Sequence, residues 1–197
     1  MNEEKVKSCC TWPGNNPLMI EYHDNEWGVP IHDDNKLFEF LILEGAQAGL
    51  AWQTVLNKRQ NYRKAFSDFN PSEIARYGGK DIKRLLSDSG IIRNRLKILA
   101  TIQNAKKFLE IQREFGFFDT YIWQFVGNKQ IKNAFKSLNE IPATTKESDA
   151  MSKDLRKKGF KFIGSTICYA FMQAVGMVND HEVTCFRYDL MDNKRSK

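Results

Sequence analysis

The sequence predicts an all-α fold, and three observations support this prediction. Apolar residues recur at helical spacing, strand-like alternation is nearly absent, and the expected helix starts combine a capping residue with acidic residues in the first turn. We expect roughly nine or ten short helices. They would form a single domain over residues 1–197, as one unit or as two helical lobes with a pocket between them, with tails at about residues 1–8 and 190–197.

Four segments place the main helices in order along the chain. Residues 37–44 have the i, i+3, i+4, i+7 spacing of a buried helix face. Asn70 with Pro71 predicts a second helix start, and Thr145 predicts another, because both residue types cap helices and acidic residues follow them. A long helix is expected to run toward Phe115. Its start is indicated by the helical spacing of Leu96, Leu99, Ala100, Gln103 and Lys107.

Length and composition indicate a globular protein. The chain has 197 residues, of which 42% are hydrophobic and 27% charged, and this excludes disordered and fibrous classes. The 30 basic residues outnumber the 24 acidic ones, so the formal net charge is +6. This charge is compatible with a polyanionic partner such as nucleic acid, although it is also common in proteins that have none.

The sequence shows no targeting or membrane segment. Residues 1–7 have mixed charge and no apolar core, so they match neither a secretory signal nor a transit peptide. The longest apolar stretch, residues 162–178, is interrupted by polar residues and is too short for a membrane span. We therefore expect a cytoplasmic protein without membrane contacts. In that reducing compartment its four cysteines should bind metal or pack rather than form disulfides.

A glycine-bracketed turn is a candidate phosphate site. Gly159 and Gly164 bracket a turn between two predicted helices, and the second helix opens with Ser165 and Thr166, a pattern typical of a helix-hairpin-helix motif. A glycine allows close backbone approach, and a helix start offers free N–H groups and a positive dipole end to a phosphate. The surrounding positive charge comes from Arg156, Lys157, Lys158 and Lys161. The alternative is an ordinary corner with a solvated basic face. Residues 89–95 form a second candidate of similar strength, which could contact the DNA backbone through its arginines.

Two separate pairs of residues are candidate metal ligands. His181 and Cys185 are spaced i, i+4, so on a helix both would point to one side as two ligands of a tetrahedral zinc. His23 with Cys10 could supply the other two, and Cys9 is an equal rival at this stage. Such a site would clip the two ends of the chain together. The alternative is that these residues only pack in the core.

One acidic residue lies in the apolar stripe of a predicted helix. Glu44 follows the apolar residues 41–43 and precedes a run of small residues that ends at Trp52. A partly buried carboxylate beside aromatic rings suits a flat cationic or electron-poor heterocycle. Further walls could come from Tyr22, Trp12 and Trp27. The alternative is that Glu44 is a structural ion-pair or capping residue and that the tryptophans fill the core.

Taken together, these motifs resemble those of bacterial 3-methyladenine DNA glycosylase I over nearly the whole chain. The motifs are Cys10-Thr-Trp12, Tyr22–Gly28, Leu43–Gly45, Ala48–Trp52, Gly159–Gly164 and Asn179–His181. The resemblance implies an all-α helix-hairpin-helix glycosylase fold with a structural zinc clip, and its Cys-x-Trp spacing selects Cys10 over Cys9. The implied zinc ligands are Cys10, His23, His181 and Cys185. The implied base pocket consists of Glu44, Tyr22 and Trp52, with Trp12 and Trp27 close by. Met19 and Ala170 depart from the family pattern, in which tyrosine and serine are expected.

The resemblance also implies an activity. A monofunctional enzyme of this family flips 3-methyladenine out of double-stranded alkylated DNA and hydrolyses its N-glycosidic bond. Glu44 is the expected catalytic residue, and it either orients the attacking water or acts only by recognising the base. Asn179 stands where many helix-hairpin-helix glycosylases carry an aspartate, and a cationic base needs less help to leave than a neutral one. DNA contacts are expected from Leu50 as a wedge and from the turn with Gly159, Lys161, Gly164, Ser165 and Thr166. We expect a monomer. The alternatives are a helix-hairpin-helix module that binds DNA without catalysis and a glycosylase that prefers another alkylpurine.

Overall fold

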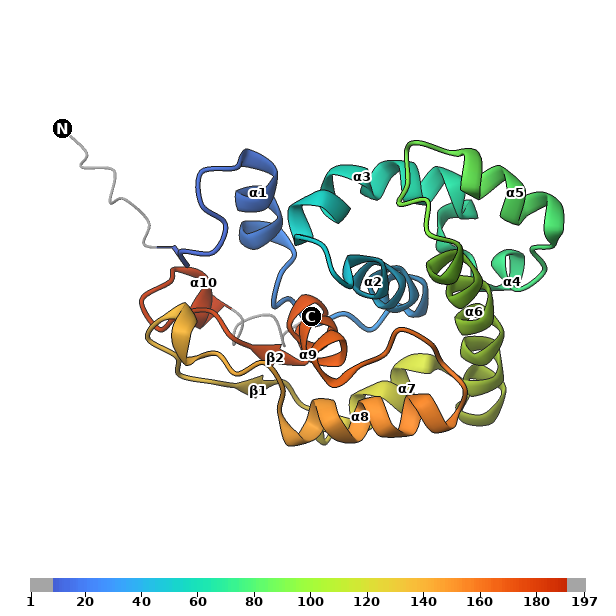
Figure 1. Cartoon of the computed structure of the whole chain (residues 1–197). Helices are drawn as coiled ribbons and strands as arrows, with labels where there is room; N and C mark the ends of the chain where they lie inside the picture. The colour runs from blue at the N-terminus through green and yellow to red at the C-terminus, as the bar shows by residue number, and fades with distance from the viewer. Residues whose placement is uncertain (1–8, 191–197) are drawn as a thin grey trace.

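The computed structural model describes residues 9–190 and is mostly helical (Figure 1). The helices are α1 (Pro17–Asn25), α2 (Asp34–Gln47), α3 (Trp52–Ala65), α4 (Pro71–Ile74), α5 (Gly79–Ser87), α6 (Arg95–Phe115), α7 (Phe118–Ile122), α8 (Lys146–Lys157), α9 (Ser165–Ala174) and α10 (Arg187–Leu190), with 3₁₀ turns η1 (Ser67–Phe69), η2 (Trp123–Val126) and η3 (Leu138–Glu140). Strands β1 (Ile131–Lys132) and β2 (Val178–Asn179) form one short parallel pair. The predicted all-α class is confirmed apart from this pair. No helix in the described part of the chain has the length and apolarity to cross a membrane.

Helix α2 lies in the middle of the molecule (Figure 1). Every residue from Leu37 to Ala46 is buried, because α3, α6, α7 and α9 pack around the helix. The side chain of Asp33 caps its start by accepting a hydrogen bond from the Lys36 N–H. A helix that is apolar all round is expected in this position. Glu44 is thereby carried into the core near the end of α2.

Two predicted helix starts are confirmed by their capping geometry. The Asn70 side chain accepts hydrogen bonds from the backbone N–H groups of Ser72 and Glu73 at the start of α4. The Thr145 hydroxyl accepts one from Ser148 at the start of α8. In both places the cap satisfies backbone donors that have no partner within the helix.

The predicted long helix toward Phe115 is confirmed as α6. Of the residues that indicated its start, Ala100 is buried, whereas Leu96 and Leu99 are 66% and 36% exposed. The buried face consists of Ile98, Ala100, Thr101, Ile102, Asn104, Ala105, Phe108 and Ile111. The helix carries two overlapping apolar stripes, and its packing against α4, α5 and α2 decides which one meets the core.

The two ends of the described chain lie side by side, as the blue and red segments at the left of Figure 1 show. The Cys10 thiol accepts a hydrogen bond from the Glu182 N–H at 3.3 Å, and the Thr11 N–H donates to the Glu182 carboxylate at 3.3 Å. The predicted tails, residues 1–8 and 191–197, lie outside the described residues; Leu190 still belongs to α10.

Candidate functional site

A cavity of about 320 Å³ opens between α1, α2, α3 and α9. The structure brings all five predicted pocket residues to its wall, namely Trp12, Tyr22, Trp27, Glu44 and Trp52. The other lining residues are Gln47, Leu138, Ile141, Pro142, Ala143, Thr166, Tyr169, Ala170 and Gln173. Of the two positions that depart from the expected family pattern, Ala170 lines this cavity, whereas Met19 is partly buried and packs against the hydrophobic core.

Aromatic rings form two adjoining walls of the cavity. The ring centroids of Tyr22 and Trp52 lie 5.4 Å apart, and those of Trp12 and Trp27 lie 5.1 Å apart. The indole N–H groups of Trp12 and Trp52 are buried and have no hydrogen-bond partner among the described residues. Because a buried donor without a partner is costly, these two groups are available to acceptor atoms of a ligand.

Glu44 places a carboxyl group at the cavity without any internal partner. Its side chain is 3% exposed, and no described residue forms a hydrogen bond or ion pair with it. Burial raises the pKa of Glu44 to about 8. Burial, and then the nearby Glu44 carboxylate, raise the pKa of the Tyr22 hydroxyl. A positively charged ligand would favour the ionised carboxylate, so the cavity suits a flat cationic ring.

An ion-pair network fastens the three helices that carry the pocket residues. Arg59 of α3 donates to Glu39 of α2 and to Glu26 at the end of α1, each at 2.6 Å. Arg63 of α3 also reaches Glu39, at 2.8 Å. The Arg59 guanidinium lies 5.0 Å from the ring centroid of Phe40. Tyr22, Glu44 and Trp52 are therefore held by elements that are cross-linked through charge-assisted hydrogen bonds.

Sequence reasoning named Thr166 and Ala170 but did not recognise that one stripe of α9 forms a wall of the cavity. Thr166, Tyr169, Ala170 and Gln173 line it together because they are spaced i, i+3, i+4 and i+7 on α9. A signal for this wall does exist, since polar side chains fall on a single stripe of an otherwise apolar helix. No spacing signal marks the loop residues 138–143, which reach the cavity only through the tertiary fold.

The turn between α8 and α9 is held firmly. Its Gly159 has a left-handed φ of +94°. Asn104 of α6 accepts a hydrogen bond from the Lys161 N–H at 2.8 Å and donates to the Lys161 carbonyl at 3.0 Å. Ser152 and Arg156 both donate to the Ile163 carbonyl. Gly164 provides no capping side chain, so the first N–H groups of α9 remain without a side-chain partner.

Apart from Thr166, which lines the cavity, the residues predicted to contact DNA lie at two places outside it. Leu50 is 40% exposed in the short loop between α2 and α3. The Lys97 ammonium braces that loop by donating to the Ala46 and Ala48 carbonyls at 2.7 Å each. Gly159, Lys161, Gly164 and Ser165 lie in the α8–α9 turn or at the start of α9 and do not line the cavity.

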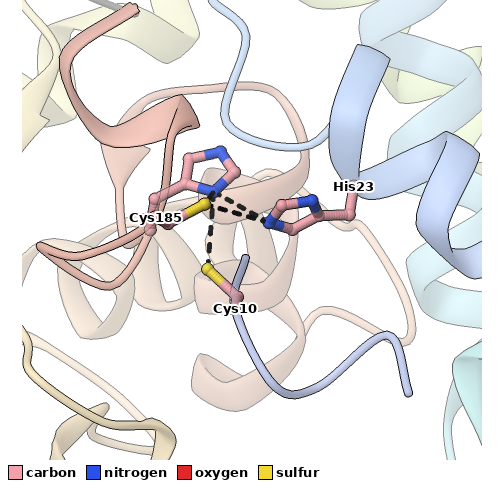
Figure 2. A group of neighbouring side chains, drawn as sticks. Cys10, His23 and Cys185 are labelled. Carbon is pink, nitrogen blue, oxygen red and sulfur yellow. Dashed lines mark hydrogen bonds between the residues drawn. The ribbon is translucent and has the colours of Figure 1, made fainter. Parts of the chain in front are cut away.

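A second cluster lies where the chain ends meet. Cys10, His23, His181 and Cys185 are buried, and their ligand atoms lie within 4.8 Å of one another. Figure 2 shows the two thiols and the His23 ring directed toward a common centre. His181 Nδ1 lies 3.2 Å from His23 Nε2, 3.6 Å from Cys10 Sγ and 3.7 Å from Cys185 Sγ. These four residues could hold a metal ion.

Neighbouring groups orient the ligand atoms. His23 Nδ1 lies 2.7 Å from the Asp24 carboxylate, which leaves Nε2 for the cluster. His181 Nε2 donates to the Trp27 carbonyl at 3.2 Å, which leaves Nδ1 for the cluster. Such partners fix the tautomer of metal-binding histidines. Gly28, with a φ of +78°, leaves room for this arrangement, because a Cβ there would lie 3.0 Å from His181 Nε2.

One expectation about this cluster is wrong. His181 and Cys185 are not on a helix; the segment forms a turn before α10. The His181 N–H donates to the Asn179 side chain, and the Cys185 N–H donates to the Glu182 carbonyl. These short-range bonds replace the helical pattern, and they still bring both ligand atoms to one side. Cys9 belongs to a different grouping, with His23 and Asp24.

Comparison with known proteins gives one consistent result. A family model described as "Methyladenine glycosylase" matches residues 12–188. The chain is 51% identical to DNA-3-methyladenine glycosylase 1 of Escherichia coli (strain K12), over 91% of this chain and 96% of that protein. A crystal structure of 3-methyladenine DNA glycosylase I matches with a TM-score of 0.88 at 51% identity, covering 91% and 98% of the two chains. The Staphylococcus aureus enzyme, described for its recognition of 3-methyladenine, matches with a TM-score of 0.89 at 32% identity, covering 91% and 95%.

Proposed function

The chain belongs to the methyladenine glycosylase family, and from that premise we propose that it excises 3-methyladenine from alkylated DNA by hydrolysing the N-glycosidic bond. The observation that carries this proposal is the buried carboxyl of Glu44, which has no internal partner and lies at a cavity walled by Tyr22 and Trp52. A module that only grips the DNA backbone has no use for such a pocket.

The pocket selects the damaged base by its charge. Alkylation at N3 makes adenine cationic, and a cation stabilises the ionised form of Glu44 in its low-dielectric surroundings. The rings of Tyr22 and Trp52 then enclose the base, and the cation interacts favourably with their faces. Neutral adenine lacks the charge that compensates for burying the carboxylate. Glu44 is therefore the catalytic residue of the proposal, because it touches the reacting base.

Cleavage of the glycosidic bond needs few further catalytic groups from the protein. A cationic base is a good leaving group and departs with the electron pair of the glycosidic bond while water adds to the sugar carbon. Asn179, at the position where related enzymes carry an aspartate, does not face this step. Its side chain donates to the Tyr188 carbonyl at 3.0 Å and accepts from the His181 N–H, so its role is to hold the chain near the metal cluster.

Two elements outside the cavity would hold the DNA. The uncapped start of α9, with Gly164, Ser165 and Thr166, suits a phosphate oxygen, and Lys161 adds positive charge beside it. We assign this α8–α9 unit as the helix-hairpin-helix motif. Leu50, exposed between the helices that carry Glu44 and Trp52, is the wedge that would occupy the stack when the damaged nucleotide rotates out.

The Cys/His cluster fits a structural zinc ion. Zinc–sulfur bonds of about 2.3 Å and zinc–nitrogen bonds of about 2.0–2.1 Å place tetrahedral ligand atoms roughly 3.3–3.8 Å apart. The four hydrogen-bond-range separations among Cys10, His23, His181 and Cys185 are 3.2, 3.6, 3.6 and 3.7 Å. Four protein ligands would close the coordination shell, so the ion would clip the chain ends together and take no part in hydrolysis.

The test is release of free methylated base. Purified protein is incubated with methylated duplex DNA, and released bases are separated by chromatography. We expect 3-methyladenine to be released, and the Glu44→Gln variant to release it far more slowly. DNA binding without any released base would favour the binding-module alternative. Release of 7-methylguanine in preference to 3-methyladenine would instead show a different base preference.

A further inference from the structure

We propose that Gln173 is a specificity-determining residue of this pocket, with its amide oxygen accepting a hydrogen bond from the exocyclic amino group of the flipped base. We further propose that buried Asp180 is the positioning residue that sets this orientation. The inference rests on the proposed function, because it assigns part of the same cavity.

The orientation of the Gln173 amide follows from its partner. Gln173 lines the cavity, and its Nε2 lies 2.8 Å from Asp180 Oδ2. A carboxylate offers only acceptors, so the amide must turn its NH₂ group toward Asp180. No described residue donates to the remaining amide oxygen. Gln173 can therefore offer the cavity an acceptor but not a donor.

Asp180 is itself fixed, so the amide cannot easily reverse. It is 1% exposed, and its Oδ1 accepts a hydrogen bond from Asn133 at 2.6 Å. Its Oδ2 also accepts from the Tyr169 hydroxyl at 2.6 Å. The Asn133 backbone N–H in turn bonds to the Asn179 carbonyl. Tyr169 lines the cavity as well, and because its proton is used by Asp180, its oxygen also offers only lone pairs.

The resulting distribution of donors and acceptors matches an adenine-type base. Asp180 fixes Gln173 and Tyr169 as acceptors, ionised Glu44 is a third acceptor, and the unpartnered indole N–H groups of Trp12 and Trp52 are donors. The remaining polar lining residues, Tyr22, Gln47 and Thr166, can donate or accept. An exocyclic amino group carries two N–H donors, and the ring nitrogens of the base are acceptors. A guanine-type base has an oxygen in place of that amino group. This oxygen would face acceptors and leave them unpaired, which is the kind of mismatch that polar sites reject strongly.

The test compares two alkylated bases on one protein. Gln173→Met keeps a similar length and removes the acceptor, and kcat/KM is measured for release of 3-methyladenine and of 3-methylguanine from methylated duplex DNA. We expect kcat/KM for 3-methyladenine to fall about tenfold and that for 3-methylguanine to stay level or rise. The preference for adenine over guanine therefore falls at least about tenfold. Gln53→Met, at an exposed position on α3, is the matched control and should retain both values.

Asp180→Asn tests the positioning role, because an amide no longer dictates which end of Gln173 faces it. The ratio of kcat/KM for 3-methyladenine to that for 3-methylguanine should fall in this variant too. Because His181 is the next residue, an unchanged Tm and an unchanged metal content are the controls. A ratio within twofold of wild type in folded Gln173→Met overturns the assignment of Gln173, including the case in which both substrates slow equally. A normal ratio in folded Asp180→Asn overturns the role of Asp180. Failure of the proposed function looks different, since wild-type protein would then release no methylated base.

Discussion

The Cys/His cluster and the cavity are adjacent, and their polar groups are paired to different extents. In the cluster both histidines have a partner for the ring nitrogen that faces away, and both thiols accept backbone N–H bonds. In the cavity, no residue of the described chain pairs with the Glu44 carboxyl or with the indole N–H groups of Trp12 and Trp52. Complete pairing is typical of structural sites. Buried groups left without partners indicate a place where a ligand completes the bonding.

The two regions share the helix α1. Tyr22 faces the cavity and the next residue, His23, faces the cluster. Trp12 packs edge-on against both, with ring centroids 6.2 Å from Tyr22 and 5.5 Å from His23. We therefore expect substitutions in the cluster to disturb the cavity wall as well, whereas substitutions of Glu44 should leave the cluster intact.

Removal of one metal ligand should have the largest effect. Cys10→Ser is expected to lose bound zinc and to lower the Tm by more than about 10 °C, because a structural metal contributes directly to folding free energy. Metal content is measured by mass spectrometry and the Tm by circular dichroism. Cys9→Ser is the matched control and should keep both values. Equal metal loss in the two variants would show that the chosen ligand set is incorrect.

The unpaired carboxyl should make stability depend on pH. Its pKa is about 8 in the folded chain against an ordinary value of 4.5, so the folded state holds an extra proton between these values. Stability is then fully present below about pH 4.5 and falls as the pH rises through 8. Glu44→Gln should match wild type near pH 5 and exceed it by up to roughly 4 kcal/mol near pH 9. Urea unfolding at both pH values measures the free energy of unfolding of the two proteins. The same difference between them at pH 5 and at pH 9 would contradict this prediction.

Loss of the Glu44 charge should slow excision by about 100-fold in kcat/KM, since a hydrogen bond to a charged group is worth roughly 1.5–3 kcal/mol. Wild-type kcat/KM should rise with pH and level off above about 8, because the ionised form binds the cationic base. The profile of Glu44→Gln should lack this rise. Glu21→Gln, at an exposed position on α1, serves as the control. If kcat/KM of the wild-type protein does not change with pH, ionisation of the Glu44 carboxyl is not required for excision.

The smallest effect is expected from removing one unpaired donor. Trp52→Phe keeps an aromatic wall but deletes the indole N–H, so binding of free 3-methyladenine, followed by intrinsic fluorescence, should weaken roughly 3–10-fold. Trp123→Phe deletes an N–H that already donates to the Ile31 carbonyl at 3.0 Å. It should reduce stability without changing affinity for the base. The comparison fails if both variants bind the base as wild type does.

Features that depend on neighbouring residues could be predicted from the order of the amino acids alone. Capping by Asn70 and Thr145, the buried helix around Glu44 and the turn at Gly159 follow from local hydrogen bonding, helical period and backbone freedom. Residue patterns also made the pocket and ligand residues candidates, and the resemblance to a known family joined them into one site. Their spacing alone left Cys9 and Cys10 equal.

Which surfaces meet depends on how the whole chain packs in three dimensions. The buried face of α6, the turn that replaces a helix at residues 181–185, and the arrival of residues 138–143 at the cavity depend on contacts between segments far apart in the chain. The pairing of Gln173 with Asp180 is of the same kind, since Asn133 helps to fix it from another element. Periodicity and capping act over a few residues. Packing depends on how well whole faces of distant segments fit together, and a short stretch of sequence does not contain that information.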